Sequence, residues 1–194
     1  MRERKRKAPM IWTVIIGLVM VLSVIGFMYQ PSGESAEKYN GYRIYQAADG
    51  YYVKINDRQV RFSYHPASLA QYAAEQPAID SLKDAKMVFM TFNPEDEAAV
   101  LSGIDLARFE LSSDLGDYFG IVVQQAAALN TTLYDLPVIT CANATATQPV
   151  MQFKTGNDTK IYKEGDCIVL EAFAAEDFML LRDRLLYGMF DIIR

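Results

Sequence analysis

The sequence of 194 residues contains one histidine, one tryptophan and two cysteines. A single histidine, His65, with no cysteine or carboxylate cluster beside it makes a poor metal site. The sequence also lacks a G-x-S-x-G elbow, a phosphate-binding glycine loop and an H-E-x-x-H motif. It therefore predicts no catalytic residue, no metal ligand and no cofactor.

Charge is absent from the nineteen residues Met10 to Met28, a length that as a helix matches a bilayer core of about 30 Å. This run predicts a transmembrane helix over residues 10–29. Five basic residues precede it and only Lys38 follows closely, so the positive-inside rule predicts a cytoplasmic N-terminus and a C-terminal domain outside the cell membrane. A cleaved signal peptide is the alternative, but the apolar run is long for one and Glu34-Ser35-Ala36 is a poor cleavage site.

The predicted organisation is a basic cytoplasmic tail (1–9), a span that contacts the lipid bilayer (10–29), a stalk (30–41) and one external domain (42–194). Without the tail, 14 Lys and Arg stand against 23 Asp and Glu, a net charge of about −9. This acidic balance argues against nucleic acid as a partner.

Both cysteines, Cys141 and Cys167, fall in the part predicted to lie outside, where disulfides persist. A structural disulfide is the favoured interpretation, and its loop would stabilise the fold by roughly 3 to 4 kcal/mol. Two free buried thiols and a redox-active pair are the alternatives.

Three N-x-Ser/Thr triplets begin at Asn130, Asn143 and Asn157. Such triplets are acceptors for N-glycosylation only if the chain faces a glycosylating compartment, as the predicted topology implies. The three asparagines are therefore candidate glycosylation sites at exposed positions.

Aromatic and β-branched runs at 42–46, 51–56 and 59–64 predict a three-stranded antiparallel meander, since Asp49-Gly50 and Asn56-Asp57 suit tight turns. Residues 67–84 predict one or two short helices interrupted at Pro77. Residues 86–92 then read as an apolar strand in the middle of a sheet.

Asn93-Pro94-Glu95-Asp96 predicts the start of a long helix that Gly120 ends. Apolar residues recur along one side of it at Val100, Ile104, Ala107, Leu111, Leu115 and Tyr118. Because an apolar strand precedes the helix and another begins at Ile121, the segment predicts a βαβ unit with parallel strands and a right-handed crossover. Asp105, Asp114 and Asp117 are expected on its solvated face.

Further strands are predicted at 136–141, 149–154, 160–163 and 167–172, with tight turns that form a hairpin, followed by a helix over 175–192. Its expected buried stripe consists of Phe178, Leu181, Leu185, Met189 and Ile192. Arg182, Asp183 and Arg184 are expected to face water.

The runs PVITCANAT, CIVLEA and RDRLLYGMF are similar to those of an uncharacterised archaeal family of single-span membrane proteins with an external α/β domain. The resemblance implies location and architecture, with no activity. The order of elements, with Pro149 opening a strand, also resembles the thioredoxin-like fold, which places a cis-proline there. The position of that family's C-x-x-C is taken here by Asn93-Pro94-Glu95-Asp96.

Together these patterns predict a single-span protein that carries one external α/β domain (mixed α+β). The leading hypothesis is a non-enzymatic cell-surface or envelope domain that binds an unidentified protein partner. The rival is a membrane-tethered thiol-disulfide protein of thioredoxin-like fold.

Overall fold

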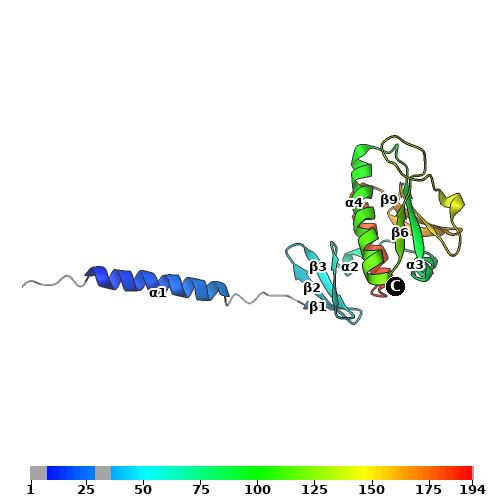
Figure 1. The fold of residues 1–194 in the computed structure, drawn as a ribbon. Helices are drawn as coiled ribbons and strands as arrows, with labels where there is room; N and C mark the ends of the chain where they lie inside the picture. Colours follow the sequence, from blue (N-terminus) through cyan, green and yellow to red (C-terminus); the bar gives the residue numbers. More distant parts are fainter. Residues whose placement is uncertain (1–7, 29–35, 194) are drawn as a thin grey trace, which may run out of the picture. The chain divides into compact units, whose positions relative to one another are not determined.

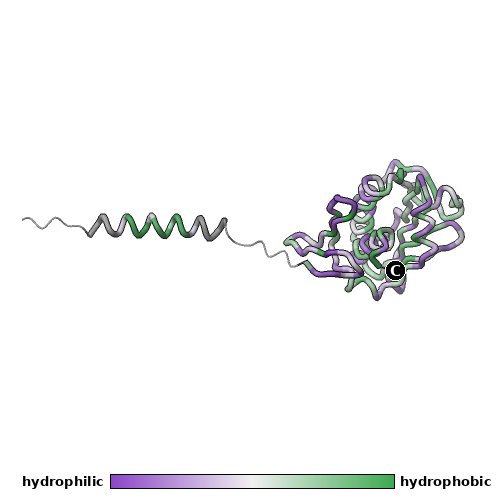
Figure 2. Tube along the Cα trace, turned by 90° about the horizontal axis from the view of Figure 1, so that it is seen from below, coloured by the Kyte–Doolittle hydropathy of each residue, from purple (hydrophilic) through white to green (hydrophobic). Residues whose placement is uncertain are grey.

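The computed structural model describes residues 8–28 and 36–193, which belong to two separate units (Figure 1). The N-terminal unit contains α1 (Ala8–Met28), whose large apolar side chains between Trp12 and Leu22 are exposed. Figure 2 shows the hydrophobic character of this stretch. Within 8–28 and 36–193, no helix reaches the length and apolarity needed to cross a membrane, so the predicted transmembrane helix is unsupported.

The C-terminal unit begins with sheet A, an antiparallel meander of β1 (Ala36–Tyr39), β2 (Tyr42–Ala47), β3 (Gly50–Ile55) and β4 (Arg58–Phe62). The meander was predicted with three strands and has four. Residues 36–39, which the composition assigned to the stalk, pair with β2 instead. The Asn40-Gly41 turn makes this pairing possible because both residues adopt positive φ, as a tight hairpin turn requires.

Sheet B has the strand order β6 (Val122–Gln125), β5 (Met87–Phe92), β7 (Val150–Thr155), β9 (Cys167–Ala172) and β8 (Lys160–Glu164). The first four strands are parallel, and β8 is antiparallel to β9. The predicted parallel pair around a crossover helix and the predicted hairpin are therefore confirmed. Pro149 precedes β7 through a trans peptide bond, and the thioredoxin-like likeness stays a prediction.

Four α-helices complete the domain: α2 (Pro66–Leu69), α3 (Gln76–Asp84), α4 (Ala98–Asp114) and α5 (Asp177–Met189). One hydrophobic core joins both sheets to α3, α4 and α5. At its centre the ring of Tyr187 on α5 stacks on Phe62 of β4, with 3.9 Å between ring centroids. The inner face of sheet B packs on this core, and a smaller cluster around Val150, Cys167 and Val169 covers part of its outer face.

The crossover helix begins later than the cap motif predicted. Asn93 closes a turn, since its Oδ1 accepts from the Glu95 amide and its Nδ2 donates to Asp96, and α4 starts only at Ala98. The predicted end is confirmed, because a π-helical turn (Leu115–Phe119) runs into Gly120 in the left-handed region.

The strand predicted at 136–141 is wrong. The chain there makes one parallel bridge, from Val138 to Ala127, and then a 3-10 helix, η2 (Cys141–Asn143). Thr140 and Asn143 form a capping box, so local side-chain hydrogen bonds compete with strand pairing at this point.

Candidate functional site

The charged triplet of α5 is buried. Arg182, Asp183 and Arg184 expose 3%, 0% and 4% of their surfaces, so the prediction that they face water is wrong. Residues 180–189 are buried on every side of α5, because α5 lies inside the core that both sheets share. A buried charge is costly unless it is paired. These three buried charged side chains and their partners are therefore the most unusual chemical feature of the domain.

Arg182 is the centre of an ion cluster that joins α4, α5 and β4. Its guanidinium donates to Asp114 on α4, with Nε 3.0 Å from Oδ2, and to the neighbouring Asp183. It also donates to the Arg61 carbonyl of β4 at 3.2 Å. Glu110 lies 3.5 Å from Arg182 and 3.6 Å from the Arg61 guanidinium. The cluster therefore fastens sheet A to the helices.

Asp183 accepts two further hydrogen bonds, from the backbone amides of Ser63 at 2.6 Å and Tyr64 at 2.8 Å. Burial raises the pKa of Asp183 to about 6, against the opposing effects of Arg182 and the two amides. Burial likewise raises the pKa of Asp114. The cluster holds three carboxyl groups and two guanidinium groups, so one carboxyl group can retain a proton without leaving a cation unpaired.

This pKa predicts how stability changes with pH. Folded Asp183 has a pKa of about 6 against an ordinary value of 3.8, so between these values the folded protein binds a proton that the unfolded chain releases. This difference adds on the order of 3 kcal/mol to the free energy of unfolding. The contribution is fully present below the ordinary pKa of 3.8 and is lost as the pH rises through about 6.

Urea unfolding across this range measures the effect. The stability advantage of the wild type over Asp183→Asn should shrink as the pH rises, whereas the exposed control Asp57→Asn should keep the pH dependence of the wild type. An advantage of the wild type over Asp183→Asn that grows with pH would contradict the assignment.

Asp105 and Asp114 were expected on a solvated helix face, and the structure corrects this for Asp114, whose side chain is 14% exposed, whereas the Asp105 side chain is 45% exposed. Asp114 binds Arg182. Asp105 lies 2.9 Å from Nη1 of Arg108, a guanidinium that is buried over the Phe92 ring. Asp117 is exposed, as predicted.

Arg184 is the exception among the buried guanidinium groups. Its Nε donates to the Tyr72 carbonyl at 3.1 Å, but its Nη1 is buried without a hydrogen-bond partner among the described residues. Burial lowers its pKa, and the charged state of Tyr39 is what opposes this shift.

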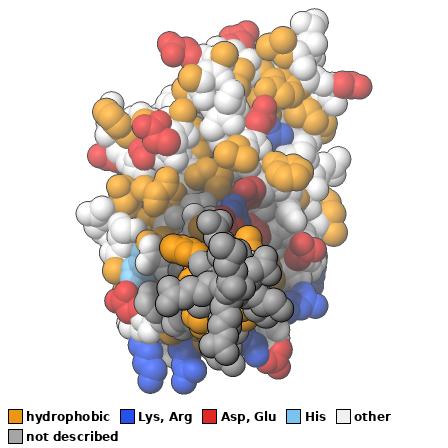
Figure 3. Space-filling model, turned by 90° about the vertical axis from the view of Figure 1, so that its left-hand side faces the viewer, with side chains coloured by type: hydrophobic (Ala, Val, Ile, Leu, Met, Phe, Trp, Pro, Cys, Tyr) orange, Lys and Arg blue, Asp and Glu red, His pale blue; other side chains and the backbone are white. Residues whose placement is uncertain are grey.

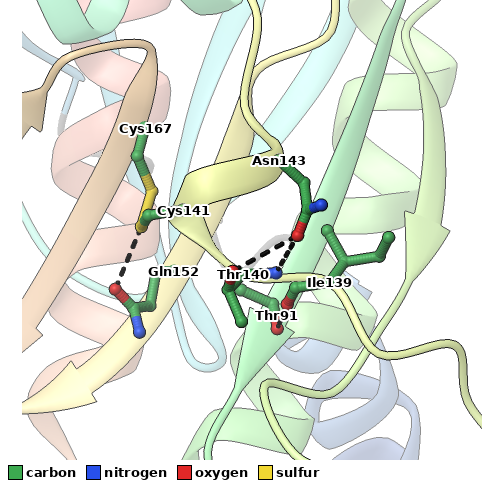
Figure 4. Close-up of a disulfide and its surroundings, with 7 residues drawn as sticks. All are labelled: Thr91, Ile139, Thr140, Cys141, Asn143, Gln152 and Cys167. Carbon is green, nitrogen blue, oxygen red and sulfur yellow. Dashed lines mark hydrogen bonds between the residues drawn. A yellow bond between two sulfur atoms is a disulfide. The ribbon is translucent and has the colours of Figure 1, made fainter.

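The predicted disulfide is present and joins Cys141 to Cys167, with 5.1 Å between their Cα atoms. Figure 4 shows that it ties η2 to the first residue of β9. Beside it Gln152 Oε1 lies 3.1 Å from Cys141 Sγ, and Thr91 Oγ1 donates to the Ile139 carbonyl. The disulfide therefore holds the long loop between β6 and β7 on the outer face of sheet B.

The three candidate glycosylation sites, Asn130, Asn143 and Asn157, are exposed. In Asn143 the side-chain Oδ1 is occupied by hydrogen bonds from the amide and hydroxyl of Thr140, as Figure 4 shows. Whether any of the three carries a glycan stays a prediction.

The His65 side chain caps the N-terminus of α2, since its Nδ1 accepts a hydrogen bond from the Ala67 amide. Its Nε2 lies 3.5 Å from a Glu37 carboxylate oxygen and is buried without a hydrogen bond. In the described part of the chain, no group of three or more His, Cys, Asp or Glu side chains could hold a metal ion.

The outer face of sheet B carries a polar cluster at the ends of β7, β8 and β9. Glu171 accepts from the Tyr162 hydroxyl at 3.1 Å and lies 3.5 Å from Lys154 and 3.7 Å from Lys160. Lys160 also pairs with Asp158 at 2.9 Å. The charges of this cluster balance, so it presents no unpaired group to a ligand.

Large apolar side chains are exposed on the domain as well. Phe109 of α4 exposes 75% of its surface, Leu133 72% and Phe173 70%, and Leu106, Val122, Leu129 and Val138 are also exposed. Figure 3 shows one face of the molecule, on which hydrophobic side chains gather in several groups between acidic ones. Exposed apolar side chains mark a protein-binding region where they form one contiguous patch.

No protein-family model, curated protein or solved structure matches this chain. The structure therefore defines its class by architecture alone: an α/β domain with two sheets around one core, an internal ion cluster and one disulfide.

Proposed function

We propose that the protein is a single-span membrane protein with a cytoplasmic N-terminus, and that its external domain binds another protein without catalysing a reaction. The sequence supports the anchor through the uncharged run from Met10 to Met28 and the basic residues before it. The exposure of apolar side chains along α1 is consistent with a lipid environment.

The observation that carries the binding function is the exposure of Phe109, Leu133 and Phe173 on the domain. Exposing aromatic and aliphatic side chains to water is unfavourable, and aromatic side chains are enriched where proteins bind each other. The disulfide fits an oxidising compartment. In the rival thiol-disulfide function a sulfur must be open to attack; Cys167 is completely buried and Cys141 is half-buried, so the attack would have to occur at Cys141.

One experiment tests both parts of the proposal. The full chain carries a photo-activatable phenylalanine analogue at position 109, membranes are washed with alkaline carbonate, and the washed fraction is irradiated. We expect the protein to stay in the membrane fraction and to form a discrete cross-linked product with another protein.

The matched control carries the same analogue at Gln71, an exposed position on the connection between α2 and α3. It should form no such product. Release of the wild type by carbonate would refute the anchor, and equal cross-linking from positions 71 and 109 would refute a binding surface at Phe109.

A further inference from the structure

We propose that the domain binds a basic segment of another protein, one that carries Lys or Arg side chains beside apolar ones. The docking surface is the apolar patch formed by Leu106, Phe109 and Leu133. This inference rests on the proposed function and deepens it, because it names the chemistry of the partner that the surface at Phe109 would bind.

The three members of the apolar patch come from two segments that the fold brings together. Leu106 and Phe109 lie one turn apart on α4 and expose 49% and 75% of their surfaces. Leu133, which is 72% exposed, belongs to the loop that follows β6. The next residue, Tyr134, donates its hydroxyl to Asp105 Oδ2 at 3.0 Å, and Asp105 immediately precedes Leu106. The loop is therefore held against the turn of α4 that carries the patch.

The base of the apolar patch is ordered by further contacts. The Tyr134 ring meets the Phe92 ring of β5 edge to face, with 5.0 Å between centroids. The buried Arg108 guanidinium lies 4.1 Å above the same Phe92 ring and donates to Gln125 of β6. Because these contacts fix the loop and α4 to the sheet, a partner would bind the patch with little loss of backbone freedom in this domain.

The charge around the apolar patch selects the partner. Between Lys86 and Lys154 the sequence has eight carboxylates and one basic residue, Arg108. The carboxylates are Glu95, Asp96, Glu97, Asp105, Glu110, Asp114, Asp117 and Asp135. Since Arg108 is buried and paired with Asp105, neither α4 nor the loop after β6 exposes a basic side chain. An acidic surface of this kind attracts a cationic partner.

Asp135 is the carboxylate best placed to meet such a partner. It follows Tyr134 in the loop and is exposed, and it has no hydrogen bond or ion pair with the described residues of the chain. The nearby Asp105 already accepts from Arg108 and from Tyr134. A free carboxylate beside exposed apolar side chains matches the polar rim and apolar centre of a protein interface, in which charges select the partner.

The same acidic charge disfavours the other occupants of an exposed apolar surface. A second copy of this chain would bring its own Asp135 and acidic α4 against the patch, so like charges would face each other. Anionic lipid headgroups and nucleic acid would be repelled for the same reason. A segment that combines cationic and apolar side chains gains from both features of the surface, and it is the occupant that we infer.

The photo-activatable phenylalanine analogue at position 109, in the full chain in washed membranes, is also the probe of the partner's charge. Asp135→Lys reverses the free carboxylate, and Asp84→Lys makes the same change of net charge at an exposed position on α3. We expect Asp135→Lys to reduce the cross-linked product about tenfold, because it sets like charges against each other. The control Asp84→Lys should leave the yield unchanged.

The salt dependence tests the same charge without a substitution. Raising the NaCl concentration from about 0.05 M to about 0.5 M should also reduce the product at position 109, because salt screens exposed charges. Circular dichroism verifies that each variant keeps its fold, and the salt series decides if Asp135→Lys does not. Mass analysis of the cross-linked partner peptide should find Lys or Arg close to the attachment point.

The outcomes separate this inference from the proposed function. A protein product that is insensitive both to Asp135→Lys and to salt would overturn the basic partner and leave protein binding at Phe109 intact. A cross-linked peptide from a second copy of this chain, or an adduct with lipid, would also overturn the inference. The absence of any product from position 109 would instead refute the protein-binding function on which the inference rests.

Discussion

Replacing Arg182 by alanine is expected to lower the free energy of unfolding by about 3 to 5 kcal/mol, among the largest effects of any single substitution in this domain. The variant leaves Asp183 fully buried without its cation, and Asp114 loses the same partner. Loss of one member of a buried ion pair costs more than the pair contributes, because the remaining charge stays out of water. Urea unfolding of the full chain, followed by circular dichroism, measures the change.

Arg61→Ala provides the matched control within the same cluster. Arg61 is 40% exposed and lies 3.6 Å from Glu110, so its removal is expected to cost less than about 1 kcal/mol. Losses of similar size in the two variants would show that the cluster is not organised around Arg182.

Removing the disulfide is the second large expected effect. The double variant Cys141→Ser with Cys167→Ala should lose about 3 to 4 kcal/mol of unfolding free energy, because the bond closes a loop across 26 positions in the unfolded chain. It should retain its fold, since the apolar contacts around Val150 and Val169 persist. Urea unfolding of the oxidised wild type and the double variant gives the difference.

The redox behaviour of the same bond separates the two hypotheses of function. Because Cys167 is fully buried, we expect a potential below about −300 mV, as in structural disulfides. Alkylation and mass analysis across a glutathione series measures it. A potential between roughly −120 and −270 mV, as in redox proteins, would instead support the thiol-disulfide hypothesis.

Short sequence patterns correctly predicted those structural features that depend only on residues close together in the chain. The turn at Asn56-Asp57 requires positive φ, and the structure has it there. The apolar run at 86–92 became the strand β5, and the stripe on α4 buried Ile104, Ala107 and Leu111 as its spacing predicted. Such signals work because side-chain period and turn chemistry depend on neighbours in sequence.

The sequence also indicated that α5 is buried, through apolar residues that lie outside the predicted buried stripe. Leu180, Leu186 and Tyr187 lie off the predicted stripe and are as apolar as its members. A helix that is apolar on all sides is a buried helix, so the charged triplet between these residues had to lie inside the fold. Its partners on α4 and β4 are distant in sequence, which is why no local pattern revealed them.

The sequence by itself indicated the disulfide pair, the βαβ unit, the hairpin of β8 and β9, the C-terminal helix and the acidic charge of the domain, because these follow from residue type and short-range spacing. Only the tertiary structure decided that Arg182 meets Asp114 and Asp183, that Arg184 is left without a counter-charge and that residues 36–39 join sheet A. These outcomes depend on which segments, distant in sequence, pack together in the core. A charged side chain that becomes buried there needs a partner inside the fold, because an unpaired buried charge is unfavourable.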